Sequence, residues 1–228
     1  VKLCQTARQP GDRRFRPVRF IDQPATENQR LFRVIQALAG MGLQRFQQRV
    51  LLFGGSGGAG RQDTWSWDGL MWHQHAPALS PSGRTFTAMT WDPVRRRVVL
   101  FGGRRGAGPN SVLADTWEWD GVAWHDVTPA VSPPRRYRHA LAWDGARQRV
   151  VLFGGVSNTS LSDTWEWDGT RWVDVSAVTS PPAREGHAMA WDPVRRCIVL
   201  FGGVSGLTDT WEWSNGVWTP RSPLVSPP

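Results

Sequence analysis

Continuous apolar runs that end in a pair of glycines recur four times after residue 49. In one of them, Val98–Phe101 is followed directly by Gly102 and Gly103. A short run of this kind, without polar alternation, is typical of a strand that is covered on both faces. The four runs end in the tripeptide Phe-Gly-Gly, at residues 53–55, 101–103, 153–155 and 201–203.

A second kind of segment alternates between polar and aromatic positions. In Thr116–Trp119 the two tryptophans fall on one face of a strand, because side chains alternate between the faces. The segment opens with Asp-Thr-Trp in every unit, at 63–65, 115–117, 163–165 and 209–211. Asp-Gly or Asn-Gly follows at 68–69, 120–121, 168–169 and 215–216. This pair favours a β-hairpin turn, since both residue types tolerate positive φ.

Each unit is predicted to hold four strands. Besides the two strands above, a fourth carries the tryptophan after the turn, at positions 72, 124, 172 and 218. A first strand precedes the apolar run and carries Ala-x-x-Trp-Asp, at 88–92, 140–144 and 188–192. Ser-Pro spacers at 80–81, 132–134, 180–182 and 226–228 separate the units as loops, because proline cannot donate to a central ladder.

Together these features resemble the kelch repeat, including the kelch-like central domain of galactose oxidase, over roughly residues 49–228. The resemblance implies an all-β fold, a β-propeller of four-stranded antiparallel blades. We expect about four blades in an incomplete arc, and the missing blades from the rest of the chain. The expected blades are 46–79, 84–131, 135–179 and 184–224.

The first unit differs from the others because no Ala-x-x-Trp-Asp segment precedes Val50. Residues 36–42 stand in its place and carry no strand pattern, so we expect this blade to lack its first strand. Residues 1–45 have two interpretations. Codons for Met41-Gly42 can encode Trp-Asp when they are read one base out of frame. This suggests that the residues before about Gln44 were translated out of frame, and the nucleotide sequence would test it. The alternative is a basic leader with a short helix over 28–43.

Charge and cysteine content narrow the range of partners. The net charge is +8, but residues 1–49 hold 10 Lys/Arg against 3 Asp/Glu, and the remainder holds 17 against 16. A nearly neutral repeat region argues against a nucleic-acid partner. No apolar run of about 18 residues is present, so no membrane span is expected. Cys4 and Cys197 form no disulfide framework, so no redox compartment follows from them. The location is unknown from the sequence, and of the alternatives an extracellular or cell-envelope location is favoured.

The loops between the second and third strands are the candidate ligand-binding face. They contain 7, 11, 7 and 5 residues between the glycine pair and the Asp of Asp-Thr-Trp. In an up-and-down blade they share a face with the proline-rich connections between blades. Variable loops on a rigid scaffold are where recognition usually occurs. The candidates are Arg61, Arg104, Arg105, Asn110 and Asn158.

The strictly repeated residues are assigned structural roles. We expect the aspartates to cap turns or accept backbone N–H groups beside the glycine pairs, and the tryptophans to pack between blades. His139 and His187 share a position that is Thr87 in the second unit, and no metal site or cofactor is predicted. The structural set is Gly54, Gly55, Gly102, Gly103, Gly154, Gly155, Gly202, Gly203, Trp65, Trp117, Trp165, Trp211, Asp63, Asp115, Asp163 and Asp209.

The sequence therefore predicts a non-enzymatic binding or scaffolding module for a protein or a glycan. The alternative is part of a secreted carbohydrate-active enzyme or oxidase whose catalytic residues lie outside these 228 residues. The copper oxidase that the fold resembles uses tyrosines and histidines at its metal. Here Tyr137 is the one tyrosine, so that motif is absent. A third option is architectural display of repeats on a surface protein.

Overall fold

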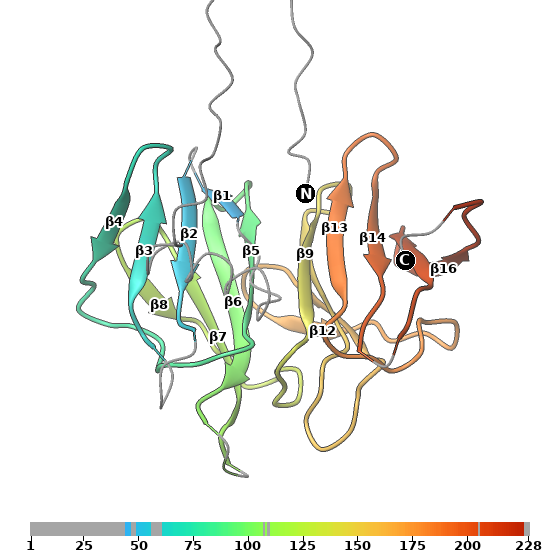
Figure 1. Cartoon of the computed structure of the whole chain (residues 1–228), viewed down its shortest axis with the longest axis horizontal. Helices are drawn as coiled ribbons and strands as arrows, with labels where there is room; N and C mark the ends of the chain where they lie inside the picture. The colour runs from blue at the N-terminus through green and yellow to red at the C-terminus, as the bar shows by residue number, and fades with distance from the viewer. Residues whose placement is uncertain are drawn as a thin grey trace, which may run out of the picture.

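The computed structural model describes residues 44–46, 49–55, 61–106, 108, 110–204 and 206–225. These residues form sixteen β-strands. Each set of four consecutive strands makes one antiparallel sheet, so the chain builds four blades in sequence order. The blades stand side by side in an incomplete propeller arc, with β4 and β16 toward its two ends (Figure 1). The predicted all-β propeller fold is confirmed.

The strands of each blade run from the inside of the arc outward. The first blade holds β1 (Gln44–Phe46), β2 (Arg49–Phe53), β3 (Thr64–Trp67) and β4 (Trp72–His75). The second holds β5 (Ala88–Asp92), β6 (Arg97–Arg104), β7 (Val112–Trp119) and β8 (Trp124–Asp126). The third holds β9 (Ala140–Asp144), β10 (Arg149–Phe153), β11 (Thr164–Trp167) and β12 (Trp172–Asp174). The fourth holds β13 (Ala188–Asp192), β14 (Cys197–Phe201), β15 (Thr210–Ser214) and β16 (Val217–Arg221).

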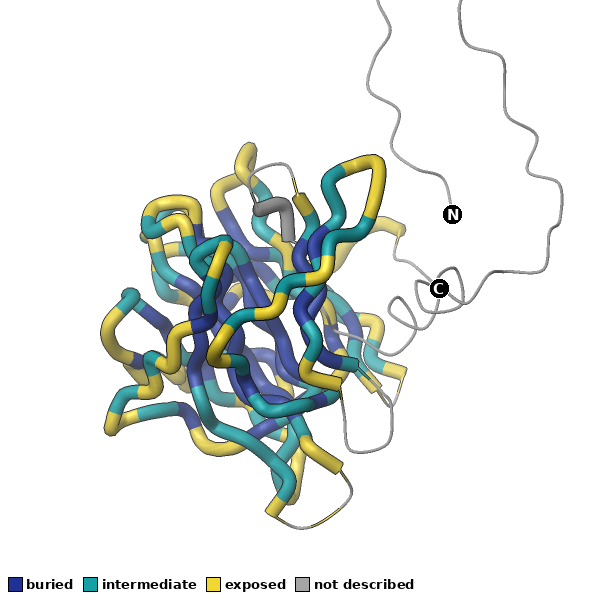
Figure 2. The backbone as a smooth tube through the Cα atoms, turned by 90° about the vertical axis from the view of Figure 1, so that its left-hand side faces the viewer, coloured by how far each residue is buried: buried dark blue, intermediate teal, exposed yellow. Residues whose placement is uncertain are grey.

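The apolar runs occupy the second strand of each blade and are covered on both faces. In β6, Val98 and Leu100 pack toward the first blade, whereas Val99 and Phe101 pack toward the third. Side chains alternate between the faces of a strand, so one continuous run supplies two hydrophobic layers. Three such layers lie between successive blades, and the tube drawing shows the buried residues concentrated in the inner strands (Figure 2).

The hairpins between the third and fourth strands differ from one another. Asn215 and Gly216 both have positive φ and form a two-residue turn between β15 and β16. At the Asp-Gly sites only the glycine has positive φ. There the aspartate closes a longer turn, as when Asp68 Oδ1 accepts the backbone N–H groups of Leu70 and Met71. At the Asp-Gly sites the aspartate side chain therefore stabilises the turn by hydrogen bonds, and the first turn residue does not adopt a left-handed conformation.

The expectation that the first blade lacks its innermost strand was wrong. Gln44–Phe46 forms β1 and pairs antiparallel with β2, so the first sheet also has four strands. β1 has three residues, against five in each of β5, β9 and β13. A strand can be defined by its backbone pairing alone, without the Ala-x-x-Trp-Asp pattern, and it is this pairing that places it here.

Residues 1–43 lie outside the described residues, and so do both interpretations of the N-terminal segment. Cys197 is a buried free thiol in β14. Within the described ranges, no helix has the length and apolarity needed to cross a membrane.

Candidate functional site

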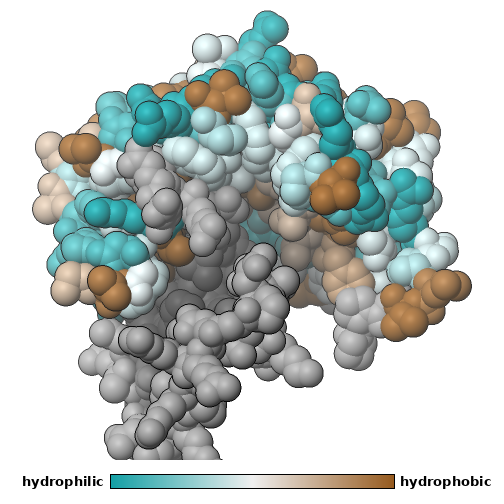
Figure 3. All heavy atoms as spheres, turned by 90° about the horizontal axis from the view of Figure 1, so that it is seen from above, coloured by the Kyte–Doolittle hydropathy of each residue, from teal (hydrophilic) through white to brown (hydrophobic). Residues whose placement is uncertain are grey.

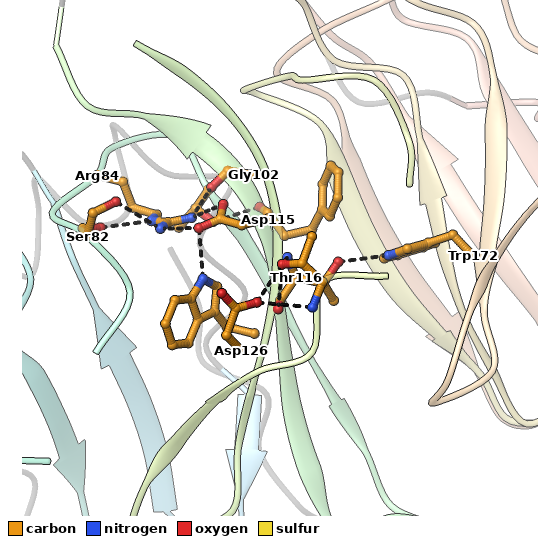
Figure 4. Close-up of polar contacts among 11 residues, drawn as sticks. Ser82, Arg84, Gly102, Asp115, Thr116, Asp126 and Trp172 are labelled. Carbon is orange, nitrogen blue, oxygen red and sulfur yellow. Dashed lines mark hydrogen bonds and ion pairs between the residues drawn. The ribbon is translucent and has the colours of Figure 1, made fainter. Parts of the chain in front are cut away.

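A buried arginine fastens the start of each of the last three blades. Arg84 precedes β5, and its side chain is fully buried. Its guanidinium donates to both carboxylate oxygens of Asp115 at 2.7 Å and to the backbone carbonyl of Gly102 at 2.9 Å (Figure 4). The Trp117 indole N–H donates to the same carboxylate at 2.7 Å. Two parallel N–H···O bonds give this pair a fixed geometry.

The same arginine clamp recurs in the third and fourth blades. Arg136 binds Asp163 through two bonds of 2.6 Å, and Arg184 binds Asp209 at 2.6 and 2.7 Å. Burial alone would raise the pKa of the Asp163 carboxyl, but the hydrogen bonds and charge of Arg136 outweigh it and lower that pKa. The carboxylate therefore stays ionised opposite a buried cation.

The glycine pairs connect each clamp to the preceding blade. The Gly103 N–H donates to the carbonyl of Arg136 at 2.9 Å, and Gly155 N–H donates to that of Arg184 at 2.8 Å. Gly102 has a φ of +56°, and a Cβ there would lie 2.7 Å from the Arg136 carbonyl oxygen. Any larger residue at this position would push two blades apart, which explains the repeated Phe-Gly-Gly.

The repeated aspartates of the last three blades thus bind the clamp arginine and the tryptophan indole, whereas the Asp63 carboxylate binds the Trp65 indole alone among the described residues. The sequence analysis missed the arginines. A regular signal was present, because each clamp arginine stands 18 residues before the first glycine of its pair. These bonds occupy both carboxylate oxygens of Asp115, Asp163 and Asp209 and stabilise the scaffold. The described residues contain no group of three or more potential metal ligands.

A pocket of about 400 Å³ opens on the face that carries the loops between the second and third strands. Its walls come from the β6–β7 loop, the connection between the second and third blades, and the β10–β11 loop. The lining residues are Arg104, Gly108, Asn110, Val112, Arg135, Tyr137, Ser157 and Asn158. Two guanidinium groups, two amides and two hydroxyls converge there, and none of the described residues that line the pocket is a carboxylate.

Tyr137 lies at the centre of this wall and is held from both sides. It pairs with Val156 through two backbone hydrogen bonds, of 2.9 and 3.0 Å. The Arg104 guanidinium lies over its ring, 5.3 Å from the centroid, and Arg104 Nε also donates to the Ser111 hydroxyl at 3.2 Å. A cation above an aromatic face is attracted by the ring's negative face. The arginine is therefore oriented before any ligand arrives.

A second aromatic–cation contact lies beside Tyr137, between residues that do not line the pocket. Phe86 lies 6.1 Å from Tyr137 between ring centroids, and Arg138 lies 4.8 Å from the Phe86 centroid. Arg138 also forms an ion pair with Glu185 at 3.2 Å. Phe86 and Arg138 both have a φ near +55°, an uncommon conformation for residues with a side chain. Gly186 has a φ of +65° at the equivalent position of the fourth blade, so this conformation is a repeated feature of the blade start.

Three of the five sequence candidates, Arg104, Asn110 and Asn158, line this pocket together, whereas Arg61 and Arg105 do not. The sequence analysis did not select Arg135, Tyr137 or Ser157. The proline-rich connection that carries Arg135 and Tyr137 was expected on the same face, so their proximity could have been inferred from topology. Ser157 could not, because its place depends on how the β10–β11 loop folds.

His139 and His187 are buried between blades and away from this pocket. Phe101 contacts His139 edge to face at 5.5 Å, and Phe153 contacts His187 in the same way. Burial lowers the pKa of His187 to about 3 and that of His139 well below its usual value, with Arg184 and Arg136 adding to the effect. The backbone carbonyls of Phe101 and Phe153 lie nearby and oppose this, without the geometry of a hydrogen bond.

Comparison with known proteins agrees with this geometry. No curated protein matches the chain significantly. A family model, the KLHDC2/KLHL20/DRC7 Kelch-repeats domain, matches residues 36–203, which is most of the chain and includes the pocket and the first two clamps in full. Four antiparallel blades, the glycine pairs and the family match lead to one conclusion: the chain belongs to this family of Kelch-repeat domains.

Proposed function

We propose that this Kelch-repeat domain binds a peptide segment of a partner protein in the pocket between its second and third blades. Kelch-repeat domains are typically protein-binding modules. The observation that carries the proposal is the convergence of Arg104, Arg135 and Asn158 on a 400 Å³ pocket whose described lining residues include no carboxylate. Pockets of roughly 300–1,000 Å³ suit small ligands and single peptide side chains.

The chemistry of the lining favours a peptide with an anionic or carbonyl-rich group. A guanidinium group binds a carboxylate through two parallel hydrogen bonds. The Asn110 and Asn158 amides can each donate to and accept from a peptide backbone. A glycan is the alternative ligand, and sugar rings usually stack on an open aromatic face. Arg104 covers one face of Tyr137, which disfavours that mode.

The test is a peptide-library selection against the purified chain, followed by affinity measurement on the enriched peptides. We expect Arg135→Ala and Asn158→Ala each to weaken binding about tenfold, the effect of losing ~1.4 kcal/mol. Arg105→Ala is the matched control. Arg105 is exposed in the same loop as Asn110 but does not line the pocket, so binding should change less than about twofold.

Two results would contradict the proposal. One is a selection that enriches no peptide under conditions in which the chain is folded. The other is an equal loss of affinity in Arg105→Ala and Arg135→Ala, which would indicate diffuse charge attraction to the face and no defined pocket.

A further inference from the structure

The two end blades carry complementary halves of the contact that joins neighbouring blades inside the molecule. At each internal junction, a fourth-strand tryptophan of one blade meets a threonine and a phenylalanine of the blade before it. Trp172 Nε1 donates to the Thr116 hydroxyl at 2.9 Å, and its ring meets Phe101 edge to face at 5.4 Å. The junction therefore combines one buried hydrogen bond with one aromatic contact.

The other two junctions repeat this geometry closely. Trp124 donates to Thr64 and Trp218 donates to Thr164, both at 2.9 Å. Their rings meet Phe53 and Phe153 at 5.1 and 5.2 Å. All nine residues of the three junctions are no more than 3% exposed. The contact is thus a repeated, fully dry connection between blades.

At one end of the arc, the fourth blade presents the accepting half of this contact without an occupant among the described residues. Phe201 and Thr210 stand at the positions of Phe101 and Thr116 but are only partly buried. Around them Ala188 and Ala190 of β13 are exposed, whereas their counterparts in the third blade, Ala140 and Ala142, are buried. An apolar sheet face with a hydroxyl acceptor is left open.

At the other end, the first blade presents the donating half. Trp72 of β4 is the counterpart of Trp124, Trp172 and Trp218, but it is only partly buried. No described residue accepts a hydrogen bond from its indole. Trp67 packs beside it at 5.6 Å and is also partly buried, whereas its counterpart Trp119 is 1% exposed. Trp72 therefore presents an indole N–H donor on the face where, at the other junctions, a preceding blade supplies the threonine acceptor.

We propose that these two faces bind one another between two copies of this chain, so that the fourth blade of each copy packs on the first blade of the other. β4 and β16, the outer strands of the end blades, lie toward opposite ends of the arc (Figure 1), and the space-filling view from above shows the described residues as an arc (Figure 3). Head-to-tail contacts form a closed ring when the rotation between neighbouring copies allows it. With two copies this ring has one twofold axis, and both end faces of each copy are buried. The pair would hold eight blades, within the range that propellers adopt.

The test uses the full chain and two blocked variants. Thr210→Arg places a charge in the accepting face, and Trp72→Arg removes the donor and places a charge in the donating face. In light scattering coupled to size exclusion, the wild type should run as a dimer of 25.6 kDa chains. Each variant alone should be monomeric, because each of its possible contacts includes one blocked face. Thr210→Ser keeps the hydroxyl acceptor, so it is the matched conservative control and should stay dimeric.

Mixing the two blocked variants provides the decisive measurement. The intact fourth blade of Trp72→Arg can still meet the intact first blade of Thr210→Arg, whereas the second contact of the pair would hold both arginines. The mixture should therefore regain a dimeric species that is held by one contact and dissociates more readily than the wild type. Near-ultraviolet circular dichroism shows whether each variant keeps its packed tryptophans. The proposal is overturned by a wild type that stays monomeric up to about 100 µM, by variants that remain dimeric, or by a ladder of larger oligomers, since open ladders arise when the rotation does not close.

Discussion

The first blade and the third blade have the same strand order but differ in how their inner edges are held. In the third blade, Arg136 binds both oxygens of Asp163. In the first blade, Asp63 keeps its bond to the Trp65 indole at 2.7 Å, but its other carboxylate oxygen is buried without a partner among the described residues. Its innermost strand is also the shortest of the four.

This difference shows that strand order and blade fastening are separable. Backbone pairing suffices to form a four-stranded sheet, even from a three-residue strand. The clamp adds a fixed position for the start of the blade, because it joins the connection, the glycine carbonyl and the third strand. The first blade, in which no described arginine binds Asp63, still has the four-stranded topology.

The largest effect is expected from Arg136→Met, which leaves Asp163 unpaired in the third blade. Removing one partner of a buried ion pair costs roughly 3–5 kcal/mol, and we expect the lower end because the Asp163 side chain is 23% exposed. Urea unfolding followed by tryptophan fluorescence measures the loss. Arg135→Met changes the exposed neighbour and should stay within about 0.5 kcal/mol. A loss below about 1 kcal/mol for Arg136→Met would show that the clamp does not stabilise the blade.

A matched pair of aspartate variants compares the two blades directly. Asp163→Asn removes the charge that faces Arg136 and should cost about 2 kcal/mol. Asp63→Asn can still accept from Trp65 and should change the free energy of unfolding by less than about 0.5 kcal/mol. Equal losses in the two variants would mean that Asp63 has a cationic partner of its own.

The next effect concerns pH and the histidines of the third and fourth blades. A histidine whose pKa is lower in the folded chain binds its proton mainly after unfolding, so stability is full above pH 6.5 and falls as pH drops toward the folded value of about 3 for His187. His187 alone should remove up to about 2 kcal/mol between pH 6.5 and 4.5.

The change that isolates this effect is His187→Thr, because Thr87 fills the same position in the second blade and donates to the Phe101 carbonyl at 2.8 Å. Burial raises the pKa of Glu118 and Glu166 and so acts in the opposite direction. The readout is therefore the difference between variant and wild type in urea unfolding across this pH range. Parallel pH profiles would contradict a buried neutral histidine.

The smallest effect separates internal junctions from the open end. Thr116→Val keeps the shape but leaves the buried Trp172 indole without an acceptor, which should cost about 1 kcal/mol. Thr210→Val makes the same change on the open face of the fourth blade. At a concentration low enough for single chains, it should cost less than about 0.3 kcal/mol. Thermal unfolding of both variants tests this, and similar losses would indicate that Thr210 has an occupant in the single chain.

Much of the scaffold could be predicted from the sequence, because repeated Phe-Gly-Gly and Asp-Thr-Trp fix strand positions four times over. β1 could not, since Gln44–Phe46 has no strand pattern and is held by pairing with β2. The pocket could be predicted only in part. Arg104, Asn110 and Asn158 were identified by loop variability, but the contact of Arg104 with Tyr137 depends on the fold of two separate loops.

The hydrogen bond from the second glycine of each pair to the clamp arginine of the next blade affects the order in which the blades unfold. The Gly103 N–H depends on the Arg136 carbonyl, and the Gly155 N–H depends on that of Arg184. Each blade therefore protects an amide of its predecessor, and stability becomes a sum of nearest-neighbour couplings along a short one-dimensional array. In such an array opening starts at the ends, so amide exchange should be slowest in β6 and β10 and fastest in the first and last blades.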